Sequence, residues 1–327
     1  MKQIVDMTMV NVQFNVNQNN TEQVIDVLND DEILIFLHLM KTGGTTLFRL
    51  IDQHYSEKQT FHYIPKKEGH QIVNLEEKLA SKKSSIKFIH GHTKFGFHKH
   101  LHQPAQYITM LREPISRVVS LYYFTHHNPN RDIPPHKHCP TLSSYLDTHL
   151  KAFNNNQTRA IAGPQAVKVP FGEEPPEMLE LAKQNLEQFL MVGITERFDE
   201  SVIVLKYTLG LQHILYSRIN ENSQRPTLDK IAIADIERIQ EYNVLDLQLY
   251  DYANKLIDQK IGKLGNTFQN EYKDFFHAIH QFNSMKINAQ SSLESTQLDL
   301  INQLKYSIFN LLKQARSKFQ KLWKSIN

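Results

Sequence analysis

The chain has 327 residues, of which 40% are hydrophobic and 22% charged, with a formal net charge of +3. This charge is too small to indicate a nucleic-acid binder, although local basic patches would be enough for a polyanionic nucleotide or an acidic polysaccharide. The one cysteine, Cys139, cannot form an intrachain disulfide, so the composition does not require an oxidising compartment.

The first 30 residues are polar and rich in asparagine, with Val24–Leu28 as a short candidate helix. They show neither a long apolar run nor the pattern of a signal peptide. We therefore expect a cytoplasmic protein of bacterial type. The next apolar run, Ile33–Leu37, is short and suits a strand that is buried on both faces.

A glycine turn, Lys41–Thr46, follows this strand and precedes a helix expected over Leu47–Tyr55. Its two glycines permit backbone angles that other residues resist. Its two threonines are expected to cap the helix, whose free N–H groups and positive dipole end attract anions. We interpret the turn as a phosphate-binding loop without the order of a Walker A motif, with a purely structural turn as the alternative.

Farther along, a basic helix is expected around Ile72–Ala80 and a strand over Ile86–His90. His90 and His92 are two residues apart, so both would face one side if the strand continued. Histidine has a reference pKa of about 6.5 and suits a general base near neutral pH. His38, beside the phosphate loop, is a second candidate for this base, and a structural role is the alternative for each.

A second strand, turn and helix begins at Tyr107. The strand is expected over Tyr107–Leu111, and Pro114 suits the first turn of a helix, where a missing N–H costs nothing. Arg112 lies at the carboxyl end of the strand, where ligands bind in open α/β sheets. Arg112 and Ser120 could bind a second phosphate, through a two-pronged charged contact and a hydroxyl donor. An ordinary surface arginine and helix serine are the alternative.

The alternation of strands and helices continues to about residue 260. Two proline-rich loops, 129–140 and 163–176, are long enough to indicate a function. Helices are expected over 178–190, 198–209, 228–242 and 244–261, and strands over 191–194 and 213–216. Such alternation predicts a parallel sheet covered on both faces.

The C-terminal segment from Ser291 has a different character. Its apolar residues follow a heptad-like spacing, and residues 301–327 include basic but no acidic side chains. A helix of this kind lies peripherally on the inner face of a membrane, pairs with another helix in an oligomer, or packs on its own domain; these alternatives stay open. We divide the chain into a polar segment 1–30, a main domain 31–265 and a helical extension 266–327.

Several phrases resemble motifs of the carbohydrate sulfotransferases that use 3′-phosphoadenosine 5′-phosphosulfate. Lys41–Thr46 resembles their 5′-phosphosulfate loop, and Arg112–Ser120 their 3′-phosphate motif, with a glutamate in place of the commoner aspartate. Ile89–Phe95 resembles the His-Gly-His phrase of the heparan sulfate 2-O branch. Asn155–Arg159 and Val192–Asp199 are also similar to family phrases. The likeness extends over residues 31–260 and is greatest to the heparan sulfate 2-O and 6-O branches.

The resemblance implies a P-loop-NTPase-like three-layer α/β sandwich with a central parallel sheet. It implies transfer of a sulfuryl group to a hydroxyl of a saccharide or glycoconjugate, with adenosine 3′,5′-bisphosphate as product and without a metal. His92 would be the base, His90 its support, and Lys41 would neutralise charge on the leaving phosphate. The donor site would comprise Lys41, Thr42, Gly43, Gly44, Thr45, Thr46, Arg112, Ser120, Arg218 and Arg225. Solvated loop residues are the alternative for Arg218, Asn220 and Arg225.

Two other functions stay open. A nucleotide kinase or NTPase would need a Walker A motif and a metal-binding aspartate after a strand, and the sequence contains neither. A catalytically inactive saccharide-binding relative is expected to have lost Lys41, Arg112 or His92, all of which are present. Zinc is a weaker alternative still, because no familiar ligand spacing is formed by His98, His100, His102, His136, His138 and Cys139.

Overall fold

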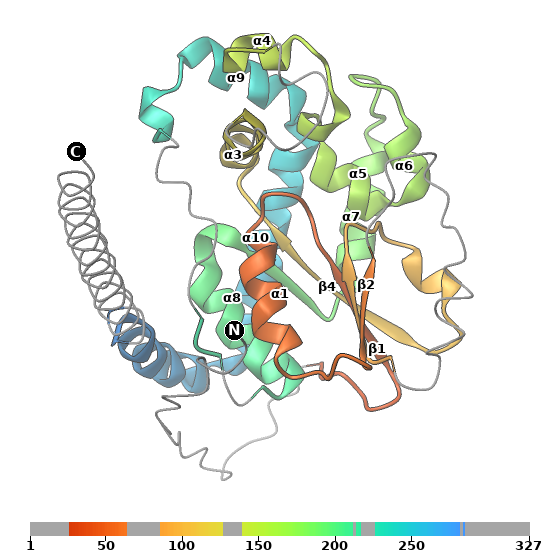
Figure 1. Cartoon of the computed structure of the whole chain (residues 1–327), viewed down its shortest axis with the longest axis vertical. Helices are drawn as coiled ribbons and strands as arrows, with labels where there is room; N and C mark the ends of the chain where they lie inside the picture. Colours follow the sequence, from red (N-terminus) through yellow and green to blue (C-terminus); the bar gives the residue numbers. More distant parts are fainter. Residues whose placement is uncertain are drawn as a thin grey trace, which may run out of the picture.

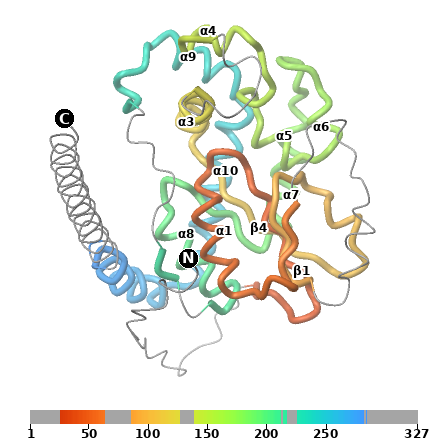
Figure 2. Tube along the Cα trace, viewed as in Figure 1, coloured from red at the N-terminus to blue at the C-terminus, as the bar shows by residue number. Residues whose placement is uncertain are grey.

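The structure, a computed structural model, describes residues 26–63, 86–126, 139–211, 214–216, 226–281 and 284. Figures 1 and 2 draw these parts in colour. Several expectations lie outside the described residues: the helix around Ile72–Ala80, the roles of Arg218, Asn220 and Arg225, the histidines His136 and His138, and the segment 291–327.

A five-stranded sheet forms the centre of the molecule, in the order β2-β3-β1-β4-β5, and every neighbouring pair is parallel. The strands are β1 (Ile33–Leu37), β2 (Thr60–Tyr63), β3 (Phe88–Gly91), β4 (Ala105–Leu111) and β5 (Met191–Ile194). Every residue of β1 and β5 is buried. Because successive side chains point to opposite faces, both faces of the sheet are covered. The α/β fold with a central parallel sheet is therefore confirmed.

Helices connect the strands, as Figure 1 shows. They are α1 (Gly44–Asp52), α3 (Pro114–His126), α5 (Asn156–Ala162), α6 (Pro164–Lys168), α7 (Glu177–Glu187), α8 (Phe198–Leu209) and α10 (Val244–Leu264). The long helix α10 packs against β5, α7 and α8, and α5 packs against α7. Single turns of 3-10 helix add η1 (Phe97–His100), η3 (Lys151–Phe153), η4 (Thr195–Arg197) and η5 (Leu228–Lys230).

A second, smaller hydrophobic cluster lies at the upper end of Figure 1, where α3 meets α4 (Leu142–Leu146) and α9 (Ile233–Tyr242). Figure 2 follows the trace from α9 at this end along α10. The cluster comprises Val118, Val119, Tyr122, Cys139, Leu142, Tyr145, Leu146, Phe153 and Ile239. It anchors α3, and with it the turn between β4 and α3 that carries Arg112.

Residues 266–281 are helical as well. Phe268, Phe275 and Ile279 are buried in the main hydrophobic cluster together with the residues of the sheet. This described part of the expected C-terminal extension therefore packs on the domain. Among the described residues, no helix has a stretch long and apolar enough to cross a membrane.

One expectation about strands was wrong, and one strand was not expected. The described residues Ile214–Tyr216 form no strand, although Ile214 and Tyr216 are buried. The Tyr216 ring packs against Phe198, with ring centroids 4.8 Å apart. A short apolar run does not distinguish a strand from a loop that is buried by packing. The fifth strand is instead β2, in which only Thr60 is buried. An edge strand without an apolar run carries no periodic signal.

Candidate active site

The loop between β1 and α1 contains two residues in the left-handed region, Lys41 with φ 68° and Gly43 with φ 75°. A lysine there is uncommon, and strained residues of this kind gather at functional sites. The expectation that Thr45 and Thr46 cap the helix was wrong. Gly43 is the N-cap, because its left-handed conformation starts the helix at Gly44, and both threonines lie within the first turn.

The N-terminus of α1 is suited to an anion. No side chain caps it, and its first turn contains no acidic residue. The first N–H groups of a helix lack acceptors within the helix, and the helix dipole makes this end positive. A glycine at the cap lets a ligand approach the main chain.

The segment that follows β5 supports the loop between β1 and α1. The Thr195 hydroxyl lies 2.8 Å from the main-chain oxygen of Thr42 and 2.9 Å from that of Leu111. It therefore ties the loop after β1 to the end of β4. A Cβ at Gly43 would lie 3.3 Å from the ring of Phe198, so the first residue of α8 supports the loop closely. Both supports belong to the phrase Val192–Asp199.

The two predicted phosphate-binding cations meet at the carboxyl edge of the sheet. Arg112 donates from Nη1 to the main-chain oxygen of Lys41 over 3.1 Å. The Nζ of Lys41 lies 3.8 Å from the centre of the Phe124 ring, on α3. Ser120 is buried in α3 with 8% of its surface exposed. Because β1 and β4 pair in parallel, their carboxyl ends lie side by side, and this brings the loop and Arg112 together. Ligands bind at this edge in open α/β sheets.

Glu196 is a charged neighbour of Arg112 that the sequence did not single out. Its Oε1 lies 3.6 Å from the Nε of Arg112, and its Oε2 accepts a hydrogen bond from the Tyr250 hydroxyl over 3.1 Å. Burial first, and then the charge of Glu196, raise the pKa of Tyr250 to about 12. The only sequence signal for this glutamate is its place in the phrase Val192–Asp199.

Glu113, which replaces the commoner aspartate, caps α3. Its carboxylate accepts hydrogen bonds from the main-chain N–H groups of Ile115 over 2.9 Å and Ser116 over 2.7 Å. A carboxylate here also matches the positive end of the helix dipole. The N-terminus of α3 is thus neutralised by its own chain, whereas that of α1 is not.

Three histidines gather beside the phosphate loop. The ring nitrogens His90 Nε2 and His38 Nδ1 are 3.0 Å apart, and His92 Nδ1 lies 2.8 Å from the main-chain oxygen of His38. The rings of His38 and His92 stack with centroids 4.7 Å apart. Strand β3 ends at Gly91, yet His90 and His92 still converge on one partner.

These contacts give the histidines different chemistry. A carbonyl oxygen only accepts, so His92 Nδ1 carries a proton and, in the neutral ring, Nε2 keeps its lone pair. Burial lowers the pKa of His38 to about 3, helped by the nearby charges of His92, His90 and Lys41. Burial and the neighbouring His62 and His92 lower the pKa of His90 to about 3. His38 and His90 are therefore neutral at physiological pH. Their facing nitrogens, His38 Nδ1 and His90 Nε2, form a hydrogen bond with each other.

The remaining candidates are the histidines and the cysteine that were considered as zinc ligands. Within the described ranges, no group of three or more His, Cys, Asp or Glu side chains could hold a metal ion. His98 contacts the hydroxyl of Tyr107 through its ring nitrogen Nδ1 over 3.0 Å. Cys139 is buried in the second hydrophobic cluster, with 6% of its surface exposed.

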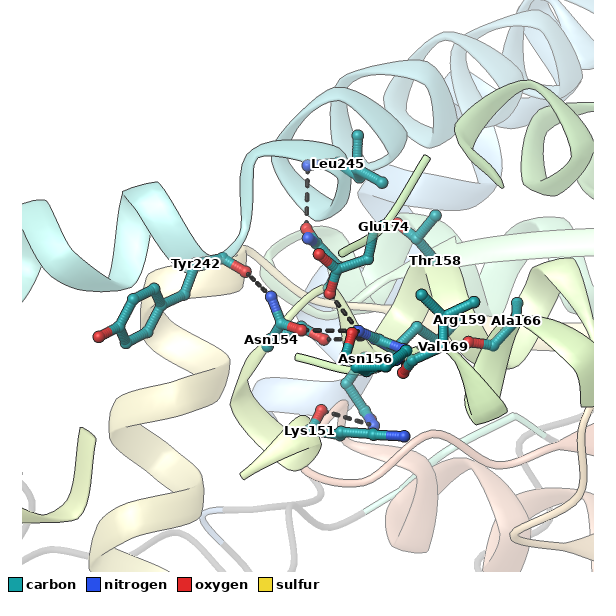
Figure 3. A network of polar contacts seen from close by, with 12 residues as sticks. Lys151, Asn154, Asn156, Thr158, Arg159, Ala166, Val169, Glu174, Tyr242 and Leu245 are labelled. Carbon is teal, nitrogen blue, oxygen red and sulfur yellow. Dashed lines mark hydrogen bonds and ion pairs between the residues drawn. The ribbon is translucent and has the colours of Figure 1, made fainter. Parts of the chain in front are cut away.

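The phrase Asn155–Arg159 builds the start of α5, drawn in Figure 3. Arg159 is 1% exposed and donates to main-chain oxygens of Ala166 and Val169 as well as to the Glu174 carboxylate. Asn154 donates to the main-chain oxygen of Tyr242 over 2.9 Å. Arg159 thus holds the segment after α5, and Asn154, just before the phrase, joins it to α9.

Comparisons with known proteins extend these observations. The model of the galactose-3-O-sulfotransferase family matches residues 21–305. Heparan-sulfate 6-O-sulfotransferase 1 of Homo sapiens is 27% identical over 290 residues, covering 71% of this chain and 67% of that protein. Heparan-sulfate 6-O-sulfotransferase 1-A of Danio rerio is 26% identical over 288 residues, with the same coverage.

Among solved structures, mouse sulfotransferase SULT7A1 complexed with PAP matches with a TM-score of 0.33 and 16% identity, over 57% of this chain and 62% of that chain. A likeness of this size carries no argument about the site. The family model, in contrast, spans most of the sequence and includes the loop after β1, the turn after β4 and the histidine cluster. The chain belongs to the galactose-3-O-sulfotransferase family and is a sulfotransferase.

Proposed function

We propose that the protein transfers a sulfuryl group from 3′-phosphoadenosine 5′-phosphosulfate to a hydroxyl of a saccharide or glycoconjugate, with His92 as the general base. The observation that carries the proposal is the hydrogen bond from His92 Nδ1 to the main-chain oxygen of His38. It leaves Nε2 as the basic nitrogen. His38 in turn packs against Gly44 of the phosphate loop, so the base lies near the donor.

The donor fits the residues at the edge of the sheet. The uncapped N-terminus of α1 suits the 5′-phosphosulfate, which the main-chain N–H groups of Gly43, Gly44 and Thr45 would bind. The Thr46 N–H already donates to the Gly43 oxygen over 3.1 Å. Arg112 and Ser120 are proposed to bind the 3′-phosphate. Arg218 and Arg225, beyond the described residues, remain candidates for further nucleotide contacts.

In the proposed reaction, the acceptor oxygen forms a bond to sulfur while the bond from sulfur to the bridging phosphate oxygen breaks. His92 Nε2 takes the hydroxyl proton, and adenosine 3′,5′-bisphosphate leaves. Lys41 offsets the negative charge that develops on the leaving phosphate. His90 supports the base indirectly, since it holds the ring of His38. As in phosphoryl transfer, the protein mainly positions groups and stabilises charge.

Calorimetric titration with adenosine 3′,5′-bisphosphate and with ADP tests the donor. Loss of a charge-assisted contact costs on the order of 1.5–3 kcal/mol, so we expect the bisphosphate to bind roughly ten- to hundredfold more tightly. Arg112→Gln should remove most of this preference. Equal affinities in the wild-type protein would contradict the proposal, and tighter binding of ADP with Mg²⁺ would favour an NTPase.

Transfer itself is tested with labelled donor and a panel of saccharides. A product labelled on a hydroxyl is the expected result. Label released only as free sulfate, for every saccharide in the panel, would contradict a saccharide acceptor while leaving the donor assignment intact.

A further inference from the structure

We propose that Gln157 is a positioning residue that holds Arg112 in the orientation needed to bind the 3′-phosphate of the donor; this inference rests on the proposed function. The Gln157 side-chain amide spans both main-chain polar groups of Arg112. Its Oε1 accepts from the Arg112 N–H over 3.0 Å, and its Nε2 donates to the Arg112 oxygen over 2.9 Å. An N–H only donates and a carbonyl only accepts, so the orientation of the amide is determined.

Arg112 depends on such a contact because of its place in the chain. It follows Leu111, the last paired residue of β4, and precedes α3, which begins at Pro114. Its main-chain groups are therefore outside the ladder of the sheet and outside the helix. Buried main-chain groups need partners, and one amide side chain from α5 supplies a partner to each group.

Gln157 is itself held firmly. It is 0% exposed, and its main-chain N–H donates to Asp246 Oδ2 over 3.1 Å. Asp246 also accepts from the N–H of Thr158 over 2.7 Å. In return, Asn155 Oδ1 accepts from the N–H groups of Leu245 and Asp246 over 2.9 and 3.1 Å. The N-termini of α5 and α10 thus cap each other, and Figure 3 shows the contact to Leu245.

This arrangement fixes the position of the main chain from which the guanidinium of Arg112 extends. With the main chain held, the side chain extends between the Lys41 oxygen and the Glu196 carboxylate, at 3.1 and 3.6 Å. A bidentate contact to a phosphate requires a defined direction as well as a charge. A group ordered before the ligand arrives loses less entropy on binding. Gln157 therefore acts through Arg112, and its effect depends on the presence of a 3′-phosphate.

The test compares adenosine 3′,5′-bisphosphate with AMP, which lacks the 3′-phosphate, by calorimetric titration. Gln157→Met keeps the length of the side chain and removes both hydrogen bonds. We expect it to weaken binding of the bisphosphate about tenfold or more, and binding of AMP less than twofold. The double variant Gln157→Met/Arg112→Ala should bind the bisphosphate as Arg112→Ala alone does, because residues acting through one contact are not additive.

Asn185→Leu is the matched control. Asn185 is a buried amide on α7 that also holds α5, through a hydrogen bond to the Ile161 oxygen over 2.8 Å. It should change neither affinity. If wild type does not prefer the bisphosphate over AMP, the proposed function fails. If wild type shows the preference and Gln157→Met retains it, the positioning role is overturned.

Thermal unfolding followed by circular dichroism reports whether Gln157→Met folds. If it does not, Gln157→Glu takes its place, because the glutamate still accepts from the Arg112 N–H but cannot donate to the Arg112 oxygen. We expect Gln157→Glu to lose at least half of the preference for the bisphosphate. A full wild-type preference in a folded Gln157→Glu protein would equally overturn the role.

Discussion

The imidazole of His38 lies directly against Gly44. A Cβ at Gly44 would lie 2.1 Å from Cδ2 and 2.3 Å from Nε2 of this ring, well inside van der Waals contact. His38 also binds the ring of His90 and the Nδ1 of His92. The phosphate loop and the histidine cluster therefore meet at a glycine, because only glycine permits so close an approach.

Gly44→Ala should displace the His38 ring and disturb both histidine contacts. We expect a loss of about 1–3 kcal/mol in the free energy of unfolding, as for other overpacked sites, together with a lower kcat. Urea unfolding and the transfer assay measure the two effects. Gly262→Ala is the control, since nothing lies within 4 Å of a Cβ at this position of α10; it should stabilise the helix by about 0.5–1 kcal/mol. Wild-type stability and kcat in Gly44→Ala would show that the ring moves freely.

Lys41→Ala should lower kcat by about 10²- to 10³-fold, because a preorganised group that stabilises transition-state charge is lost. The fold should remain, since the described contact of the Lys41 ammonium is with the Phe124 ring. Steady-state kinetics with labelled donor and circular dichroism check the two statements. Lys41→Arg keeps the charge and should retain more activity than alanine. A folded Lys41→Ala protein with wild-type kcat would remove Lys41 from the mechanism.

His92→Ala should lower transfer by about 10²- to 10⁴-fold, the usual contribution of a general base. Affinity for adenosine 3′,5′-bisphosphate should stay the same, because the imidazole acts on the acceptor hydroxyl. His90→Ala should cost less, since His90 contacts the ring of His38. His100→Ala, an exposed residue of η1, serves as the control. Full activity in His92→Ala and none in His38→Ala would move the base to His38.

Glu196→Gln should increase affinity for the bisphosphate severalfold. The carboxylate lies 3.6 Å from Arg112 Nε, with 36% of the glutamate and 13% of the arginine side chain exposed. It competes for the guanidinium and repels an incoming phosphate, and water screens part of both effects. Titration at two salt concentrations measures the change. Glu237→Gln on α9 makes the same charge change at an exposed site; an equal gain there would attribute the effect to net charge alone.

Acid should destabilise the fold through His38 and His90. Burial is the main reason that the folded pKa of each is lowered to about 3, whereas an unfolded histidine titrates near about 6.5. The unfolded chain therefore binds these protons first as pH falls. The stabilisation is complete above about pH 6.5 and is lost progressively toward pH 3, by at most about 1.4 kcal/mol per pH unit for each histidine.

Urea unfolding at pH 7.5, 6.5, 5.5 and 4.5 measures this slope. His90→Phe suits the aromatic surroundings, where the His90 ring stacks on Phe48 with centroids 4.0 Å apart. It should flatten the slope, and His100→Gln should leave it unchanged. Stability that stays constant from pH 7.5 to 4.5 would show that the two rings are not buried in neutral form.

The sequence by itself determined the elements whose signal is local. The strand Ile33–Leu37 and the helix Phe198–Leu209 have the bounds predicted for them, because an apolar run of strand length and a helical run ending before a glycine are short-range patterns. The start of α3 at Pro114 follows from the ring of proline. The order of the family phrases was also readable from the sequence and predicted a sulfotransferase.

Only the tertiary structure decided which side chains support the site. Gln157 meets Arg112 across 45 residues and Thr195 meets Thr42 across 153, and periodicity carries no information at such separations. The parallel sheet gathers the carboxyl ends of its strands at one edge, so loops distant in sequence become neighbours there. The structure also showed that the N-cap of α1 is Gly43, in the left-handed conformation, and neither of the two threonines. It also placed His92 Nδ1 2.8 Å from the main-chain oxygen of His38.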